Sequence, residues 1–218
     1  MPKIRENSYA ITLALFCSLL LISNVAATKL IVVGPLTLDG GFILFPLTYI
    51  LGDVLAEVFG WQLTRRAIFL SFALAALMSL TFWAVDLMAA SPDWPLQEAW
   101  HSVLGFVPRI VVASLLAYLA GQLLNAVVLV RIRERWGPKR LGVRLIASTV
   151  VGEFADTCVF GLIAFGPLGA IFGGDSLDFA TLVNYVLVGW GWKTLVEVVF
   201  LPVTYRVIAF VRGKDAAQ

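Results

Sequence analysis

Residues 66–88 read RAIFLSFALAALMSLTFWAVDLM, and the only charged side chains in this run are those of Arg66 and Asp86, near its ends. A transmembrane helix needs about 20 predominantly apolar residues to cross the hydrocarbon core. This run meets that length, and further runs of the chain do so too. The predicted spans are 9–33, 41–60, 66–88, 103–130, 145–173 and 179–206. The sequence therefore predicts an all-α fold, a single domain of six transmembrane helices over residues 1–218.

The overall composition is that of a polytopic membrane protein. Hydrophobic residues make up 60% of the chain and charged residues 14%, and the mean hydropathy is +0.91. A soluble domain carries about a quarter charged residues. The apolar run that follows the charged N-terminal residues exceeds the core of a signal peptide, so we interpret it as a retained first span. Cys17 and Cys158 lie in apolar runs without metal-ligand spacing, so we expect reduced packing residues.

Basic residues gather on one side of the predicted membrane. They lie before the first span, between spans two and three, between spans four and five, and after the last span. The loops at 34–40, 89–102 and 174–178 contain no Lys or Arg. The positive-inside rule then predicts a multi-pass protein of the plasma (inner) membrane with both termini cytoplasmic. The rule also explains the basic loop around residues 131–144, which could otherwise be taken for a nucleic-acid-binding patch. We therefore expect the protein to lie in the lipid bilayer and to bind no nucleic acid.

Two pairs of carboxylates lie inside predicted spans. Asp53 and Glu57 are four residues apart, and Glu153 and Asp156 are three apart, so each pair shares one helix face. A charged side chain at the bilayer centre costs roughly 2.5–3.5 kcal/mol on insertion scales. Asp53 lies about 12 Å from the cytoplasmic end of its span, at 1.5 Å per residue. Such residues favour a polar cavity with a function over a passive scaffold.

Other polar residues reach a similar depth. Asn24 is deep in the first span, Arg109, Gln122 and Asn125 are in the fourth, and Lys193 is in the sixth, four residues before Glu197 and able to pair with it. Deep acids outnumber deep cations, so pairing alone leaves carboxylates that need protons, water or a donor-rich ligand. A purely structural network of ion pairs is the alternative interpretation.

Several chemistries are missing from the sequence. It contains no Walker A pattern, no zinc-protease spacing and no nucleophile elbow, and its one histidine, His101, lies in a predicted external loop. We therefore expect no enzyme activity, no cofactor and no metal site. Small residues at four-residue spacing, Ala10 with Ala14 and Ala113 with Ala117 and Gly121, permit close helix approach within the chain or in a homo-oligomer.

At these polar positions the chain resembles the queuosine precursor transporter family, which is grouped with vitamin-uptake transporters. The matching segments are SNVAATKL at 23–30, FPLTYILGDVLAEVFG at 45–60, RIVVASLLAYLAGQ at 109–122, STVVGEFADTCVFGLIAF at 148–165 and the region around Lys193. The resemblance implies a six-helix fold related to the substrate-binding subunits of energy-coupling-factor vitamin transporters. It also implies uptake of the 7-deazaguanine bases preQ0 and preQ1.

The resemblance carries over to particular residues. The matching polar positions are Asn24, Asp53, Arg109, Gln122, Asp156 and Lys193. Asn125 stands where the family commonly has Asp, and Glu153 where it commonly has a neutral Gln or Asn. With Glu57, these positions form the expected substrate-binding set. Trp190, Phe45 or Tyr49 could stack on a flat base, with packing as their alternative role.

Three function classes follow from this reading. The first is a transporter that imports a queuosine precursor by itself. The second is a membrane substrate-binding subunit that needs a separate ATPase module, to which Ala10 and Ala14 could dock. The third is a scaffold that transports nothing, for which a ligand would give no thermal stabilisation.

Overall fold

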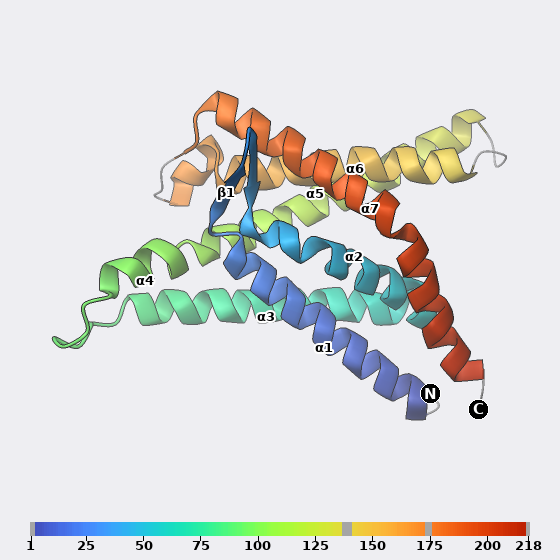
Figure 1. Ribbon diagram of the computed structural model, residues 1–218, viewed down its shortest axis with the longest axis horizontal. Coiled ribbons are helices and arrows are strands. Elements are labelled where there is room, and N and C mark those ends of the chain that lie inside the picture. Colours follow the sequence, from blue (N-terminus) through green and yellow to red (C-terminus); the bar gives the residue numbers. More distant parts are fainter. Residues whose placement is uncertain (1–2, 137–140, 173–175, 217–218) are drawn as a thin grey trace. The chain divides into compact units, whose positions relative to one another are not determined.

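The structure is a computed structural model that describes residues 3–136, 141–172 and 176–216, most of them helical (Figure 1). Its elements are α1 (Lys3–Ala26), β1 (Leu30–Val33), β2 (Leu36–Asp39), η1 (Gly40–Ile43), α2 (Phe45–Val54), η2 (Leu55–Phe59), α3 (Trp61–Asp86), α4 (Gln97–Leu104), α5 (Val107–Trp136), α6 (Leu141–Ala164), η4 (Pro167–Phe172) and α7 (Phe179–Ala216). Two compact units divide the chain. Unit 1 comprises Met1–Lys29, Asp39–Val107 and Leu195–Gln218, and unit 2 comprises Leu30–Leu38 and Pro108–Thr194. Each unit is described by itself.

Long apolar helices confirm a multi-pass membrane protein. Within the described ranges, four helices have the length and composition to cross a membrane: Asn7–Ala26, Trp61–Asp86, Gln97–Ile132 and Ala147–Ala164. A bent pair, Phe179–Phe200 with Pro202–Phe210, counts as a fifth span if it is taken as one. The predicted span at 41–60 is not among them, because α2 has 10 residues and continues into a π-helical turn of 5 residues, η2. Six spans and cytoplasmic termini therefore stay predictions.

The chain is mostly helical, as predicted, but residues 30–39 form a two-stranded hairpin, so the first span predicted at 9–33 ends earlier than expected. The helix α1 ends at Ala26, and the β-branched run Ile31–Val33 suits an extended strand. Gly34 and Pro35 connect the strands, and Gly34 has a φ of +60°, which two-residue hairpin turns require. Asn184 of α7 holds this turn in unit 2. Its Oδ1 accepts from Thr37 N at 2.9 Å and its Nδ2 donates to the Pro35 carbonyl at 3.0 Å.

Two other predicted boundaries move for local reasons. The α5 helix continues through Trp136 and α6 begins at Leu141, so the described part of the charged segment 131–144 is largely helical; residues 137–140 lie outside the described residues. At the other end, α6 stops at Ala164, and the predicted span to 173 instead continues as the 3-10 helix η4. Pro167 explains this stop, because the residue before a proline disfavours the helical conformation.

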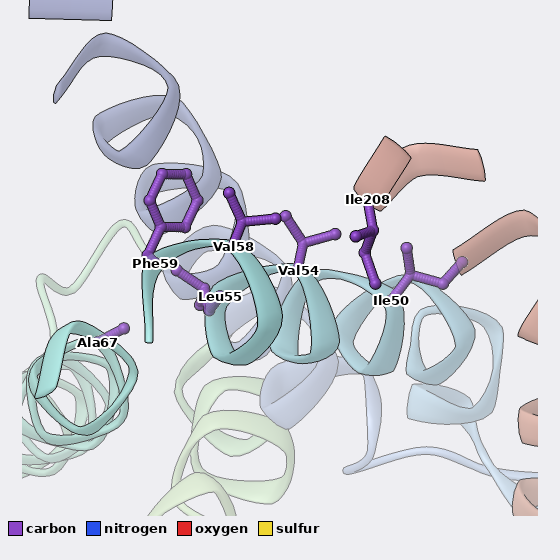
Figure 2. Packing of buried hydrophobic residues seen from close by; sticks show 7 residues of the cluster. All are labelled: Ile50, Val54, Leu55, Val58, Phe59, Ala67 and Ile208. Carbon is purple, nitrogen blue, oxygen red and sulfur yellow. The ribbon is translucent and has the colours of Figure 1, made fainter. Parts of the chain in front are cut away.

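The core of unit 1 is a cluster of aliphatic and aromatic side chains around α2 and η2. Figure 2 shows its members, which are Ile50, Val54, Leu55, Val58, Phe59, Ala67 and Ile208. Tyr9 of α1 packs its ring edge-on against Phe59, with 5.3 Å between the ring centroids, and its hydroxyl donates to the Leu63 carbonyl at 3.1 Å. This cluster packs the short helix α2 and its π turn on one face, whereas Asp53 and Glu57 on the same segment remain exposed.

The helix α7 contains Pro202 and is bent by 51° there. A proline inside a helix removes one backbone hydrogen bond and its ring crowds the preceding turn, so a kink at this point has an identified cause.

Candidate functional site

A partly buried ion pair joins α6 to α7 in unit 2. Lys193 Nζ lies 2.6 Å from Asp156 Oδ2, and the two side chains are 9% and 26% exposed. The sequence left Glu197 open as a partner for Lys193, since the two are one helical turn apart. The structure pairs this lysine with an acid on another helix instead. Both partners belong to the expected substrate-binding set, and they lie together.

Glu153 extends the same contact by one helical turn. Its carboxylate Oε2 accepts a hydrogen bond from Thr194 Oγ1 at 3.1 Å, and the residue is 8% exposed. Consecutive residues of α7, Lys193 and Thr194, thus bind two acids that are three positions apart on α6. The role of Thr194 was not predicted, because a lone threonine in an apolar run gives no distinctive sequence signal.

The helices α6 and α7 run antiparallel along this seam. Gly161 faces Tyr185, and a side chain there would come within 3.3 Å of the tyrosine ring. Further along, Trp190 Nε1 donates to the Val150 carbonyl at 3.1 Å, and the indole packs edge-on against Phe154 with 5.4 Å between ring centroids. These contacts support the packing role of Trp190. The side chains of Phe45 and Tyr49 lie outside the described residues.

Glycines let α5 approach α6 at the level of Asp156. A methyl group on Gly152 would lie 2.8 Å from Asn125 Cβ and 2.9 Å from the Gly121 carbonyl oxygen. A methyl group on Gly121 would lie 3.0 Å from Asp156 Cβ. The contact is reciprocal, with each glycine facing the polar residue of the other helix. Gly121 was predicted to permit close approach, and the structure confirms it; Gly152 was missed.

Asn125 brings an acceptor to this crossing. Its Oδ1 is buried and has no hydrogen-bond partner among the residues that the structure describes. Buried polar atoms in proteins are nearly always paired, and leaving one unpaired costs free energy. A ligand donor would satisfy this atom. Gln122, one turn earlier on α5, is exposed.

Arg109 sits at the far end of α6. Its Nε donates to the Ile163 carbonyl at 2.9 Å and its Nη2 to the Gly166 carbonyl at 3.4 Å, and the residue is 3% exposed. The last carbonyls of a helix have no intrahelical donor, so the guanidinium supplies one. Gly169 packs against the guanidinium so closely that any side chain there would overlap it. These contacts give Arg109 a structural role at the end of α6.

The remaining expected residues belong to unit 1. Asn24 is buried on α1, while Asp53 on α2 and Glu57 on η2 are exposed. Asp53 and Glu57 lie four residues apart, and because like charges repel, the pair favours a cation or a donor-rich ligand nearby.

Asp86, near the end of the predicted span 66–88, has two partners in unit 1. Its Oδ2 lies 2.6 Å from His101 Nδ1, and its backbone and side-chain oxygens accept from Gln97 Nε2 at 3.3 and 3.5 Å. Gln97 and His101 are one helical turn apart on α4, a spacing visible in the sequence. Within the described part of the chain, no group of three or more His, Cys, Asp or Glu side chains could hold a metal ion.

Long apolar helices with buried charged residues define a multi-pass membrane transporter, and comparison with known proteins agrees. The family described as "Putative vitamin uptake transporter" matches residues 39–207. A "Queuosine precursor transporter" from Escherichia coli (strain K12) is 31% identical over 75% of this chain and 69% of its own length. The chain belongs to this family of queuosine precursor and vitamin uptake transporters, as its sequence motifs indicated.

Two further relatives carry related names. A "Probable queuosine precursor transporter" from Bacillus subtilis (strain 168) is 28% identical over 84% of this chain and 77% of its own length. One from Haemophilus influenzae (strain ATCC 51907 / DSM 11121 / KW20 / Rd) is 34% identical over 77% of this chain and 67% of its own length. No solved structure matches. The relatives are transporters, so the family identifies a carrier and not an enzyme.

Proposed function

We propose that this protein imports a queuosine precursor, the 7-deazaguanine base preQ0 or preQ1, through a polar site within the membrane. The proposal rests on the family and on one observation, the partly buried ion pair between Asp156 and Lys193. A buried salt bridge is weak evidence for stability, because desolvation offsets much of the attraction. The free-energy cost of desolvating Asp156 and Lys193 is better explained if a ligand binds to the same two groups.

The chemistry of the cargo fits this pair. A deazaguanine presents N–H donors beside a carbonyl acceptor. The N–H donors can replace the ammonium on the Asp156 carboxylate, and the released Lys193 can donate to the carbonyl. Such charge-assisted hydrogen bonds are about twice as strong as neutral ones. Glu153 on α6 and Asn125, which faces Gly152 of α6, add acceptors for further donors of the base.

The remaining expected residues are proposed for each unit by itself. In unit 2, Gln122 is exposed on α5 and offers a further donor to the ligand, whereas Arg109 holds the end of α6. In unit 1, Asp53 and Glu57 offer carboxylates and Asn24 offers a donor.

Uptake of labelled preQ0 and preQ1 tests this proposal. Asp156→Asn keeps the shape of the side chain but removes its charge, and we expect uptake to fall at least tenfold at subsaturating substrate, for a loss of about 1.4 kcal/mol or more. Glu134→Gln is the matched control, because Glu134 is an exposed acid on α5. Unchanged uptake in the Asp156 variant, at equal amounts of protein in the membrane, would refute the site.

A substrate-binding subunit that depends on a separate ATPase is the second candidate. It is favoured by one observation: Ala10 and Ala14 are both exposed on α1, where a partner helix could approach. Purified protein in liposomes separates the two functions. Uptake of the base by this chain alone supports the transporter, whereas binding without uptake supports the subunit. Absence of any ligand-dependent thermal stabilisation would favour the scaffold.

A further inference from the structure

A pocket of about 320 Å³ opens where α3 ends and α4 begins, wholly within unit 1. Val85 and Met88 form part of its apolar wall, and Trp94, Gln97 and Trp100 contribute the rest of the side chains that matter here. This volume lies in the range of small-molecule sites, about 300–1,000 Å³. None of these residues belongs to the mid-membrane set described above.

Two indole rings shape the pocket. Trp94 and Trp100 meet edge-on, with 6.3 Å between centroids and 69° between planes. Phe82 holds Trp100 from α3, with 6.1 Å between centroids and 82° between planes. Flat heterocycles stack on aromatic faces with about 1–3 kcal/mol per base. The pocket therefore offers fixed walls for a planar ligand.

Two residues that line the pocket carry polar groups that a ligand could use, a donor on Trp100 and an acceptor on Gln97. Trp100 Nε1 is buried and has no acceptor among the described residues, although buried indole N–H groups usually have one. The Gln97 amide is oriented by Asp86, which accepts from its Nε2. Gln97 Oε1 remains able to accept, since no described residue donates to it. A donor and an acceptor one helical turn apart on α4 suit the edge of a lactam, which carries a C=O next to an N–H.

We propose that this pocket is an outer binding site for a planar lactam base, which it captures before transport. The inference rests on the proposed function, because a 7-deazaguanine carries such a lactam edge, and on the predicted orientation, which puts residues 89–102 outside the membrane. The carbonyl of the base accepts from Trp100 Nε1, its ring N–H donates to Gln97 Oε1, and the ring stacks on an indole. The polar set at Asp156 then acts after the base has entered.

Trp100→Phe tests the donor while it keeps an aromatic ring. We expect the substrate concentration at half-maximal uptake to rise about fivefold, the loss of one hydrogen bond of about 1 kcal/mol, while the maximal rate stays unchanged. Trp83→Phe is the matched control, because Trp83 lies on α3 but is 54% exposed and does not line the pocket. Equal half-saturation in both variants would overturn the site.

A second measurement does not depend on the folding of the tryptophan variant. Ser91 lines the pocket, so Ser91→Cys in detergent-solubilised full-length protein can be labelled with a maleimide. We expect preQ0 to slow the labelling of Ser91→Cys and to leave that of an exposed control, Gln62→Cys, unchanged. If only added phospholipid slows the labelling, the pocket holds a lipid and the proposal fails.

The two proposals fail in different ways. Absence of preQ0 and preQ1 uptake by the unmodified protein overturns the proposed function. Uptake that proceeds without protection of Ser91→Cys, and with normal half-saturation in Trp100→Phe, overturns the outer site alone.

Discussion

At the scale of single residues, Lys193 and Asp156 dominate the energetics of the described site. Their atoms approach to 2.6 Å, and the lysine is nearly buried. Removing one member of a buried pair leaves an uncompensated charge, whereas removing both leaves none. The same two residues can therefore be tested separately for folding and for transport.

Lys193→Met should lower the free energy of unfolding by about 3–5 kcal/mol, because Asp156 loses its cation. The double variant Lys193→Met with Asp156→Asn should recover most of this loss but remain inactive in uptake. Thermal unfolding of the detergent-solubilised protein measures both values, and the double-mutant cycle gives the interaction energy. A double variant as unstable as the single one would contradict the pairing.

At the scale of elements, the crossing of α5 and α6 depends on two glycines. Gly121 and Gly152 let the backbones approach closely, with Asn125 facing Gly152 and Asp156, one helical turn further along α6, facing Gly121. Small residues at helix interfaces serve this purpose in membranes, where packing and not the hydrophobic effect holds helices together. Added volume should therefore disturb both the packing and the polar site.

Gly152→Ala should cost about 1–3 kcal/mol of stability, since its methyl group would meet Asn125 and the Gly121 carbonyl. Gly191→Ala on α7 is the matched control, because nothing lies within 4 Å of the methyl group it adds. Melting temperatures of the two variants provide the comparison. If both variants melt as the unmodified protein does, α5 and α6 are not in close contact there.

The start of α7 shows a pH-dependent cap. Asp178 Oδ1 accepts from Thr181 Oγ1 at 2.6 Å and its Oδ2 accepts from Thr181 N at 3.0 Å. These bonds, the hydroxyl one first, lower the pKa of Asp178. Because the pKa of Asp178 is lower in the folded state, its ionised carboxylate stabilises the fold at pH values above the unfolded-state pKa of about 3.9. This stabilisation is lost as the pH falls through the folded-state pKa.

Asp178→Ala should therefore destabilise α7 near neutral pH and differ less from the unmodified protein as the pH falls below about 4. Hydrogen exchange in the first turn of α7 across this pH range measures the difference. Asp93→Ala, in the exposed loop after α3, serves as the control. A difference that does not shrink at low pH would show that the carboxylate does not act through its charge.

At the scale of the whole molecule, the number of membrane spans depends on one segment of the chain. Charge asymmetry predicts an even number of spans, whereas helix length supports four or five within the described residues. The segment at 41–60 decides between these values, because a crossing there brings the total from five to six. A ten-residue helix with a π turn is short for a membrane, yet charged side chains and irregular backbone are tolerated where they line a cavity.

Cysteines on either side of this segment test its crossing. Leu36→Cys and Gln62→Cys flank residues 41–60, and both positions are exposed. In a background without Cys17 and Cys158, a membrane-impermeant maleimide added to intact cells should label position 36 and not position 62. Labelling of both or neither would place the flanks on one side and exclude the crossing.

The sequence could predict most helices but not the hairpin. Hydropathy locates apolar runs because any spanning helix must be apolar and long. The same measure cannot separate residues 30–33 from the helix before them, since Leu-Ile-Val-Val is apolar in either conformation. In the structure, Asn184 forms hydrogen bonds to the hairpin turn. This residue is distant in sequence, so hydropathy gives no sign of the contact.

The sequence by itself determined the class of protein, the family and the chemical character of the deep residues, because composition, run length and motifs are local properties. Only the tertiary structure decided which groups meet. Helical spacing allowed Lys193 to pair with Glu197, and the packing of α6 against α7 pairs it with Asp156 instead. Likewise, the glycines that set Asn125 beside α6 have meaning only once two helices cross. Which side chains form ion pairs and contacts depends on the distances between helices, and the packing of the helices sets these distances.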